Sequence, residues 1–264
     1  MNKYWQIAKN TWDESLMYRT SFVLFRVREV FQLLSLYFIW LFVTPENGDF
    51  LGYTQQAMLT YVLLTALVGD FVFATRTNAI ANDINQGFLS NFLIRPISFL
   101  KYYFARDLGD KAMNISFALL ELTIIFLILR PNFFWQSDPV ILFLFIVSVG
   151  MALVLHFFIS VLLGFIGFWS NEGWGPRFIF YQMIAFFSGG LFPLDMLPQP
   201  LYTFFQFLPF TYLNFFPIQL YFGKLSFFEA LLGFFLCIVW LSIMYKFVQF
   251  VWGRGLKTYT AQGQ

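Results

Sequence analysis

The stretch PVILFLFIVSVGMALVLHFFISVLLGFIGF, residues 139–168, contains no Asp, Glu, Lys or Arg. A helix of roughly 20 apolar residues is enough to cross the hydrocarbon core of a bilayer. The stretch is therefore longer than one crossing requires. We expect a membrane-spanning helix here that tilts or projects beyond the hydrocarbon.

Further apolar segments lie on both sides of this stretch, and we expect them to span the membrane at 22–43, 53–74, 112–130, 178–195 and 226–250. Hydrophobic residues make up 59% of the chain and charged residues only 11%, whereas a soluble domain carries about 25% charged residues. The composition excludes a soluble globular protein. The predicted fold class is an all-α polytopic membrane protein with six transmembrane helices.

The positions of the 16 Lys and Arg residues predict the topology. Apart from Arg130 and Lys224, they lie in or beside the N-terminal segment, the loop 75–111, the short link near residue 175 and the C-terminal tail. Cytoplasmic loops of membrane proteins carry an excess of Lys and Arg. We therefore expect both termini in the cytoplasm.

The first 20 residues form a separate segment before the spanning domain, 21–264. Trp5, Ala8, Trp12 and Leu16 recur at helical spacing, and tryptophan favours the membrane interface. This pattern predicts an interfacial helix on the cytoplasmic side. A disordered tail is the alternative.

Residues 188–221 are apolar but repeatedly interrupted. They hold five of the ten prolines and the pair Gly189-Gly190. Proline removes a backbone donor and ends helices, while lipid tolerates broken helices only where protein satisfies the freed backbone groups. We expect short re-entrant helices that dip into the outer leaflet without crossing it.

The loop 75–111 is the longest predicted cytoplasmic segment. Ile80, Ile84, Phe88 and Phe92 recur every four residues within it, and the step Arg95-Pro96 should end the helix. The pattern predicts a short amphipathic helix that either contacts a cytoplasmic partner or lies on lipid headgroups.

Two motifs resemble the permease subunits of type-2 ATP-binding-cassette exporters. The first is the run DINQGFL followed by LIRPIS, residues 83–89 and 93–98, and the second is SGGLFPL followed by LP and LPF, residues 188–194, 197–198 and 208–210. Both occur in the family's order and at its topological positions. The resemblance covers essentially the whole chain.

The resemblance implies a coupling helix in the first cytoplasmic loop that contacts separate ATPase subunits. Its residues here are Asn82, Asp83, Ile84, Asn85, Gly87, Phe88, Arg95 and Pro96. It also implies a second permease subunit, identical or related, beside this one. The expected partners are thus proteins and membrane lipid, with no nucleic acid.

ATP should bind to the partner and not to this chain. A P-loop needs the pattern GxxxxGK[ST], but the only Gly-Lys pair, Gly223-Lys224, has Ile218 where the first glycine belongs and Leu225 after it. We therefore expect no cofactor on this chain, with ATP and Mg²⁺ on the ATPase subunits. One histidine and one cysteine also leave little material for a metal or catalytic cluster.

Glu121 is the single acid deep in a predicted span, and intramembrane acids are costly to bury. It could contact substrate, carry a proton or pair with a polar side chain on a neighbouring helix. Asp70 matches the depth of Arg26 and Arg28, which predicts a structural ion pair between the first two spans.

The aromatic outer segment offers a further candidate site. Phe204, Phe207 and Phe210 could line a substrate path or gate, or they could anchor the segment in lipid. Low polarity along the spans favours a lipophilic or amphipathic substrate. The alternatives to an ATP-driven exporter are a proton-coupled transporter that uses Glu121 and a membrane-embedded enzyme acting on lipid.

Overall fold

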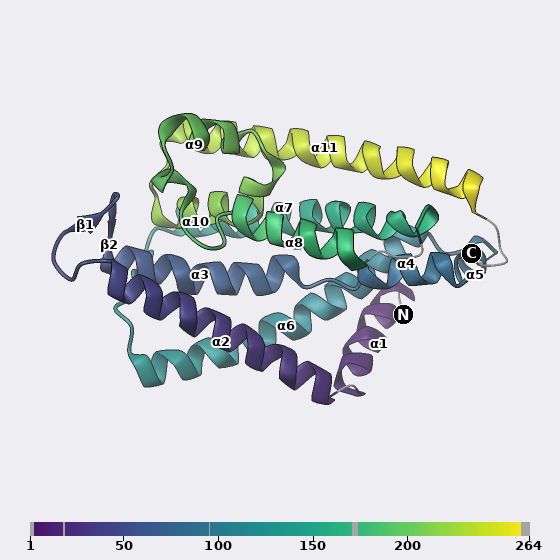
Figure 1. Cartoon of the computed structure of the whole chain (residues 1–264), viewed down its shortest axis with the longest axis horizontal. Coiled ribbons are helices and arrows are strands. Elements are labelled where there is room, and N and C mark those ends of the chain that lie inside the picture. The colour runs from purple at the N-terminus through teal and green to yellow at the C-terminus, as the bar shows by residue number, and fades with distance from the viewer. Residues whose placement is uncertain (1–2, 18, 95, 171–173, 260–264) are drawn as a thin grey trace.

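The computed structural model describes residues 3–17, 19–94, 96–170 and 174–259, and most of them are helical (Figure 1). The elements are α1 (Lys3–Met17), α2 (Arg19–Val43), β1 (Asp49–Phe50), β2 (Tyr53–Thr54), α3 (Gln55–Phe73), α4 (Asn78–Asn85), α5 (Leu89–Leu93), α6 (Phe99–Leu129), α7 (Pro139–Gly164), the 3₁₀ helix η1 (Phe165–Phe168), α8 (Trp174–Phe187), η2 (Leu194–Met196), α9 (Gln199–Gln206), η3 (Pro209–Leu213), α10 (Phe215–Phe222) and α11 (Phe227–Thr258). β1 and β2 are two residues long each and form an antiparallel hairpin in which Asp49 pairs with Thr54.

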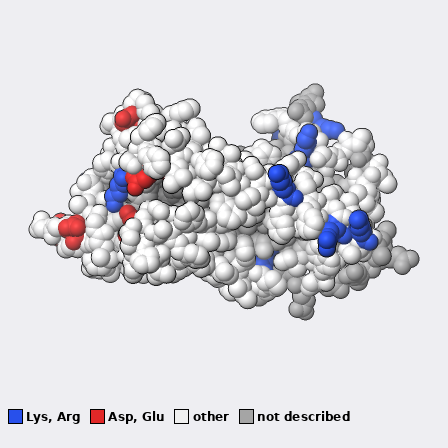
Figure 2. All heavy atoms as spheres, turned by 90° about the horizontal axis from the view of Figure 1, so that it is seen from above, with Lys and Arg blue, Asp and Glu red and all other residues white. Residues whose placement is uncertain are grey.

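The long helices lie roughly along the longest axis of the molecule (Figure 1). The β1–β2 hairpin, α9 and α10 lie at one end, which we call the hairpin end. α1, α4, α5 and the C-terminal part of α11 lie at the other, the α4–α5 end. On the face in Figure 2, basic side chains gather at the α4–α5 end and acidic ones at the hairpin end. The positive-inside rule therefore predicts that the α4–α5 end faces the cytoplasm.

Four helical segments within the described residues are long and apolar enough to cross a membrane: Gln55–Asn85, Phe99–Leu129, Pro139–Phe168 and Phe227–Thr258. α2 is long enough but carries Arg26, Arg28 and Glu29 within one turn. α8 has only 14 residues, which reach about 21 Å and so fall short of the ~30 Å hydrocarbon core. The six-span count thus stays a prediction for these two helices.

The helix that contains the third predicted span begins within the expected loop 75–111. We expected a loop up to residue 111, but α6 begins at Phe99 and runs without interruption to Leu129. The cations in its first turns suggested a loop, yet no proline follows Ser98 until Pro131, so nothing in the backbone chemistry ends the helix. α11 likewise continues to Thr258, beyond the expected end near residue 250.

The proline-rich segment 188–221 folds into the short helices η2, α9, η3 and α10 at the hairpin end (Figure 1). Gly189 begins this segment with φ of 78°, a conformation that glycine adopts without strain. A Cβ at Gly189 would lie 2.7 Å from the Tyr61 hydroxyl, which itself donates a 2.6 Å hydrogen bond to the Gly189 carbonyl. The segment is thereby attached closely to α3. Its depth in the bilayer stays a prediction.

The N-terminal helix α1 packs against α6. A Cβ at Gly109 would lie 2.3 Å from the Ala8 carbonyl, so only glycine permits this approach. Thr11 is buried on the same side, whereas Trp5 is 66% exposed. Of the stripe predicted on this helix, Ala8 therefore lies against α6 and Trp5 faces the exterior. The side chain of Leu16 lies outside the described residues.

The topology can be tested by labelling introduced cysteines in a Cys237→Ala background, because Cys237 is the only native thiol. Asn47 and Asn132 are exposed in the loops after α2 and α6. Cysteine at either position should react with an impermeant reagent in intact cells, while cysteine at exposed Gln86, near α4, should react only after membrane disruption. The reverse labelling pattern would invert the topology.

Candidate functional site

The segment between α3 and α6 holds the predicted coupling helix, and it differs from the expected single helix. α4 ends at Asn85 and α5 begins at Leu89. Gly87 lies between them with φ of 77°, and a left-handed residue ends a helix because it turns the chain away from the helical path. At the break the Gly87 carbonyl accepts hydrogen bonds from the Ser90 hydroxyl at 2.6 Å and from the Ser90 amide at 3.3 Å, so the start of α5 is attached to Gly87.

The apolar stripe of this segment is used inside the protein, which corrects the expectation that it faces a partner or lipid. Ile80 and Ile84 are buried. A Cβ at Gly164 would lie 2.7 Å from the Ile80 side chain, and one at Gly167 would lie 2.8 Å from the Ala81 backbone. α4 therefore packs on the end of α7 and on η1, where two glycines allow the approach. Spacing alone did not indicate what covers the stripe.

Two of the predicted polar residues also make internal contacts. The Asp83 carboxylate accepts a hydrogen bond from the Tyr103 hydroxyl of α6, and the Asn85 amide donates to the Ser170 carbonyl at 3.4 Å. Asn82 is exposed. Arg95 lies outside the described residues, and the carbonyl of exposed Pro96 accepts a 2.8 Å hydrogen bond from Lys3.

The exposed apolar side chains of this region lie at and beyond the Gly87 break. Phe88 is 50% exposed, Leu93 53% and Ile94 82%. We call these three residues the α5 surface. They lie at the cation-rich end of the molecule, beside exposed uncharged Asn91. Of the residues predicted for partner contact, Asn82, Phe88 and Pro96 therefore remain accessible, while Ile84 does not.

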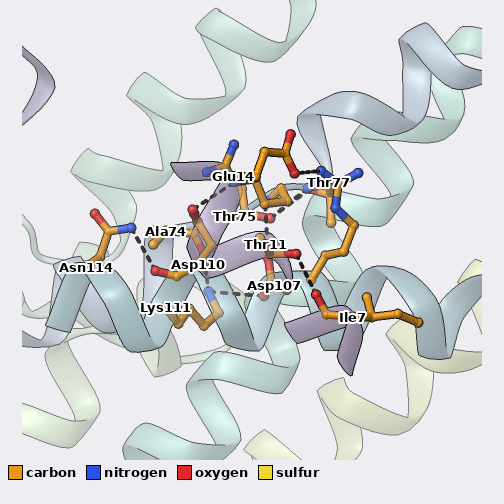
Figure 3. A network of polar contacts seen from close by, with 12 residues as sticks. Ile7, Thr11, Glu14, Ala74, Thr75, Thr77, Asp107, Asp110, Lys111 and Asn114 are labelled. Carbon is orange, nitrogen blue, oxygen red and sulfur yellow. Dashed lines mark hydrogen bonds and ion pairs between the residues drawn. The ribbon is translucent and has the colours of Figure 1, made fainter. Parts of the chain in front are cut away.

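A polar network joins the α3–α4 connection to α6 (Figure 3). Lys111 of α6 is fully buried. Its ammonium donates to the carbonyls of Val72, at 2.7 Å, and Ala74, which are among the carbonyls that the end of α3 leaves unpaired. Lys111 also lies 3.2 Å from the Asp107 carboxylate, one helical turn earlier. A cation near the C-terminus of α3 is also favourable because unpaired carbonyls give that end of a helix a partial negative charge.

The same network includes the residues directly before α4. The Asp107 carboxylate accepts from the backbone amide of Arg76 at 3.3 Å, and the Arg76 guanidinium pairs with Asp110 at 2.8 Å. On the adjoining helix α1, Glu14 pairs with Arg106 at 2.8 Å. α3, α4, α6 and α1 are thus connected around residues 72–77. The sequence analysis treated Lys111 only as a loop cation; its spacing of four from Asp107 was the signal for a helical ion pair.

Arg26 joins three long helices. It lies 3.0 Å from Asp70 of α3, and its Nε lies 2.8 Å from Glu121 of α6. The predicted pairing of Arg26 with Asp70 is present, whereas Arg28 pairs with its neighbour Glu29 and is largely exposed. Glu121 contacts a cation and not the Ser, Thr or Asn side chain expected of a structural partner. The structure assigns it to an ion-pair cluster.

A second polar cluster lies at the hairpin end. The Tyr53 hydroxyl donates to Asp195 of η2 at 2.9 Å, and Gln219 of α10 donates to Tyr53 at 2.5 Å and to Asp195 at 3.2 Å. Lys224 lies 3.9 Å from Asp195. Burial lowers the pKa of Lys224, although the charge of Asp195 opposes that shift. The cluster attaches the segment 188–221 to the hairpin.

The predicted gate residues do not share one environment. Phe204 and Phe207 are 57% and 60% exposed, so they can contact lipid, substrate or another subunit. Phe210 instead packs against Phe180 and Phe187 of α8, with ring centroids 5.8 and 6.0 Å apart. Phe210 is therefore part of the core that supports the segment.

The described residues contain no cluster of three or more His, Cys, Asp and Glu side chains that could hold a metal ion. His156 is fully buried in α7, where its ring lies 3.2 Å from the Ser160 hydroxyl and faces Phe73. The side chain of His156 is thus packed among helices.

The sequence profile of a family described as "ABC-2 family transporter protein" matches residues 30–263 of the chain. The matched region includes the α4–α5 segment, the polar network and the segment at the hairpin end. A search of curated proteins gave no match.

Proposed function

Because the chain belongs to the ABC-2 transporter family and is the permease component of an ABC transporter, we propose that it is the membrane subunit of an ATP-driven exporter. It pairs with a second permease and contacts two cytoplasmic ATPase subunits, which bind ATP and Mg²⁺. The observation that carries this proposal is the exposed α5 surface at the cation-rich end, on a segment attached to several long helices.

The charge distribution supports the orientation in this proposal. The basic α4–α5 end faces the cytoplasm under the positive-inside rule, where ATPase subunits are located. Both termini then lie in the cytoplasm and the chain resides in a bacterial inner membrane. The segment 188–221 lies on the opposite side, over the outer ends of α3 and α7.

Coupling follows from the contacts around α4. Closure of the ATPase pair on ATP moves the α5 surface and α4 with it. α4 contacts α7 and η1 through Ile80, and Lys111 joins the end of α3 to α6 directly before α4. The movement therefore reaches α3, α6 and α7. ATP shifts the permease between two states only if those states bind the ATPase pair differently.

The substrate in this proposal is lipophilic or amphipathic. The spans carry few polar side chains apart from the paired Arg26 cluster, and the segment at the hairpin end exposes Phe204 and Phe207. A path lined by such surfaces suits apolar groups better than a small ion.

The proposal is tested with Phe88→Asp and Ile94→Asp, since a carboxylate in an apolar contact must lose water without gaining a partner. We expect each variant to insert normally but to retain less than about a tenth of the ATPase chains that copurify with the wild type, a loss of at least ~1.4 kcal/mol. The copurified chains are identified by their P-loop peptides in mass spectrometry.

Asn91→Asp is the matched control, because it adds the same charge on α5 without removing an apolar side chain. It should retain the ATPase chains. A substitution at Gly87 would confuse the result, since any residue other than glycine is strained at a φ of 77°. Full retention of ATPase chains by both Phe88→Asp and Ile94→Asp would exclude docking at the α5 surface.

A further inference from the structure

The break between α4 and α5 is hydrogen-bonded to a side chain near the C-terminus of the chain. The Tyr259 hydroxyl, directly after α11, donates a 2.8 Å hydrogen bond to the Gly87 carbonyl. It also accepts a 3.2 Å hydrogen bond from the Ser90 amide. One hydroxyl therefore bonds both to the break residue and to the first turn of α5, although 172 residues separate Tyr259 from Gly87. These bonds add to those that the Ser90 hydroxyl and amide make to the same Gly87 carbonyl.

The end of α11 is itself packed closely against the neighbouring elements. A Cβ at Gly255 would lie 2.3 Å from the Phe168 ring of η1, so glycine is needed for this approach. Trp252, one turn earlier, stacks on Phe99 at a centroid distance of 4.5 Å. The backbone position of Tyr259 is therefore fixed by contacts that do not involve its hydroxyl.

We propose that Tyr259 is a positioning residue that makes the α5 surface and α11 move together. This inference rests on the proposed function, because it concerns how movement of the α5 surface reaches the last span. The contacts of α4 lead to α3, α6 and α7, and they reach α11 only through the packing of η1 against Gly255, whereas Tyr259 bonds the α5 side of the break directly to the end of α11. Without the hydroxyl, Ser90 still bonds to Gly87, but α5 can move while α11 stays in place.

The experiment compares Tyr259→Phe with Tyr245→Phe, which removes a hydroxyl from the half-exposed face of the same helix. Both variants should insert and retain the copurifying ATPase chains. ATP hydrolysis by the purified complex should fall at least roughly fivefold in Tyr259→Phe, because one neutral hydrogen bond accounts for about that factor and the hydroxyl makes two. Hydrolysis should stay at the wild-type level in Tyr245→Phe.

A distance measurement separates transmission from stability. Spin labels at exposed Leu51 and Phe227, in a Cys237→Ala background, report on the outer end of α11. The distance between them should change when the wild-type complex is trapped with ATP and vanadate, and Tyr259→Phe should abolish that change while its melting temperature stays the same. Labels at Asn91 and Lys257 should keep one distance in both states of the wild type.

The possible outcomes distinguish the two proposals. If the wild type captures no ATPase chain, the proposed function fails and this inference with it. If ATPase chains are captured but the Leu51–Phe227 distance does not change on trapping, or changes equally in Tyr259→Phe, only the inference fails. A change in the wild-type Asn91–Lys257 distance on trapping would also overturn it.

Discussion

Replacing Arg26 by methionine is expected to destabilise the protein by about 3–5 kcal/mol. The change leaves two carboxylates whose side chains are only 16% and 18% exposed without their cation. Arg26 lies against Asp70 and Glu121 and is only 5% exposed. Arg28→Met is the matched control, since that guanidinium is largely exposed and contacts only Glu29. Thermal melting in detergent should show a large loss for Arg26→Met and a small one for Arg28→Met; equal melting temperatures would contradict the structural role.

The triple variant Arg26→Met, Asp70→Asn and Glu121→Gln tests the alternative of proton-coupled transport. Neutral side chains of similar size remove the charges together, so most of the lost stability should return. If ATP drives transport, this variant should still transport in proportion to its folded amount. If Glu121 carried a proton, transport would stop in a folded protein, because glutamine cannot release one.

Replacing Lys111 by methionine is expected to have a comparable effect, about 3–5 kcal/mol of lost stability. The change removes the donor to the Val72 and Ala74 carbonyls and leaves buried Asp107 without its 3.2 Å ion-pair partner. Lys101→Met is the control, since Lys101 is exposed on the same helix. Size-exclusion chromatography of a fluorescent fusion should show aggregation only for Lys111→Met.

The double variant Asp107→Asn, Lys111→Met separates the two causes. This variant removes the unpaired charge of Asp107, but it does not restore the hydrogen bonds to the carbonyls at the end of α3. Stability should therefore return only in part. Full recovery would mean that the carbonyls of Val72 and Ala74 need no donor. A single Lys111→Met variant that elutes like the wild type would contradict the buried role of this side chain.

The sequence predicted the parts of this fold that depend on local chemistry. Five prolines and Gly189-Gly190 indicated that residues 188–221 could not form one helix, and they fold into short helical pieces. The placement of Arg26 opposite Asp70 followed from counting residues into two adjacent spans. Such predictions work because they need only helix rise and backbone hydrogen bonding.

The parts that depend on packing were not predictable in the same way. The spacing of Ile80 and Ile84 predicted an apolar stripe but assigned it to a partner or to lipid, whereas glycines of α7 and η1 allow it to pack inside the protein. Glu121 contacts Arg26 because α2 and α6 are inclined to each other (Figure 1), whereas counting depth assumes parallel helices. Tyr259 gave no signal at all, since a lone tyrosine after a span has no periodicity to reveal its partner.

The polar contacts at the hairpin end also constrain the order in which the protein is made. Tyr61 bonds to Gly189 across 128 residues, and Tyr53 bonds to Asp195 across 142. A ribosome delivers α3 to the membrane long before it delivers these partners, at roughly 5–20 residues per second. The two tyrosine hydroxyls must therefore remain near water or find temporary partners for many seconds. Biogenesis of this end is complete only when Gln219 has emerged and joined Tyr53 and Asp195.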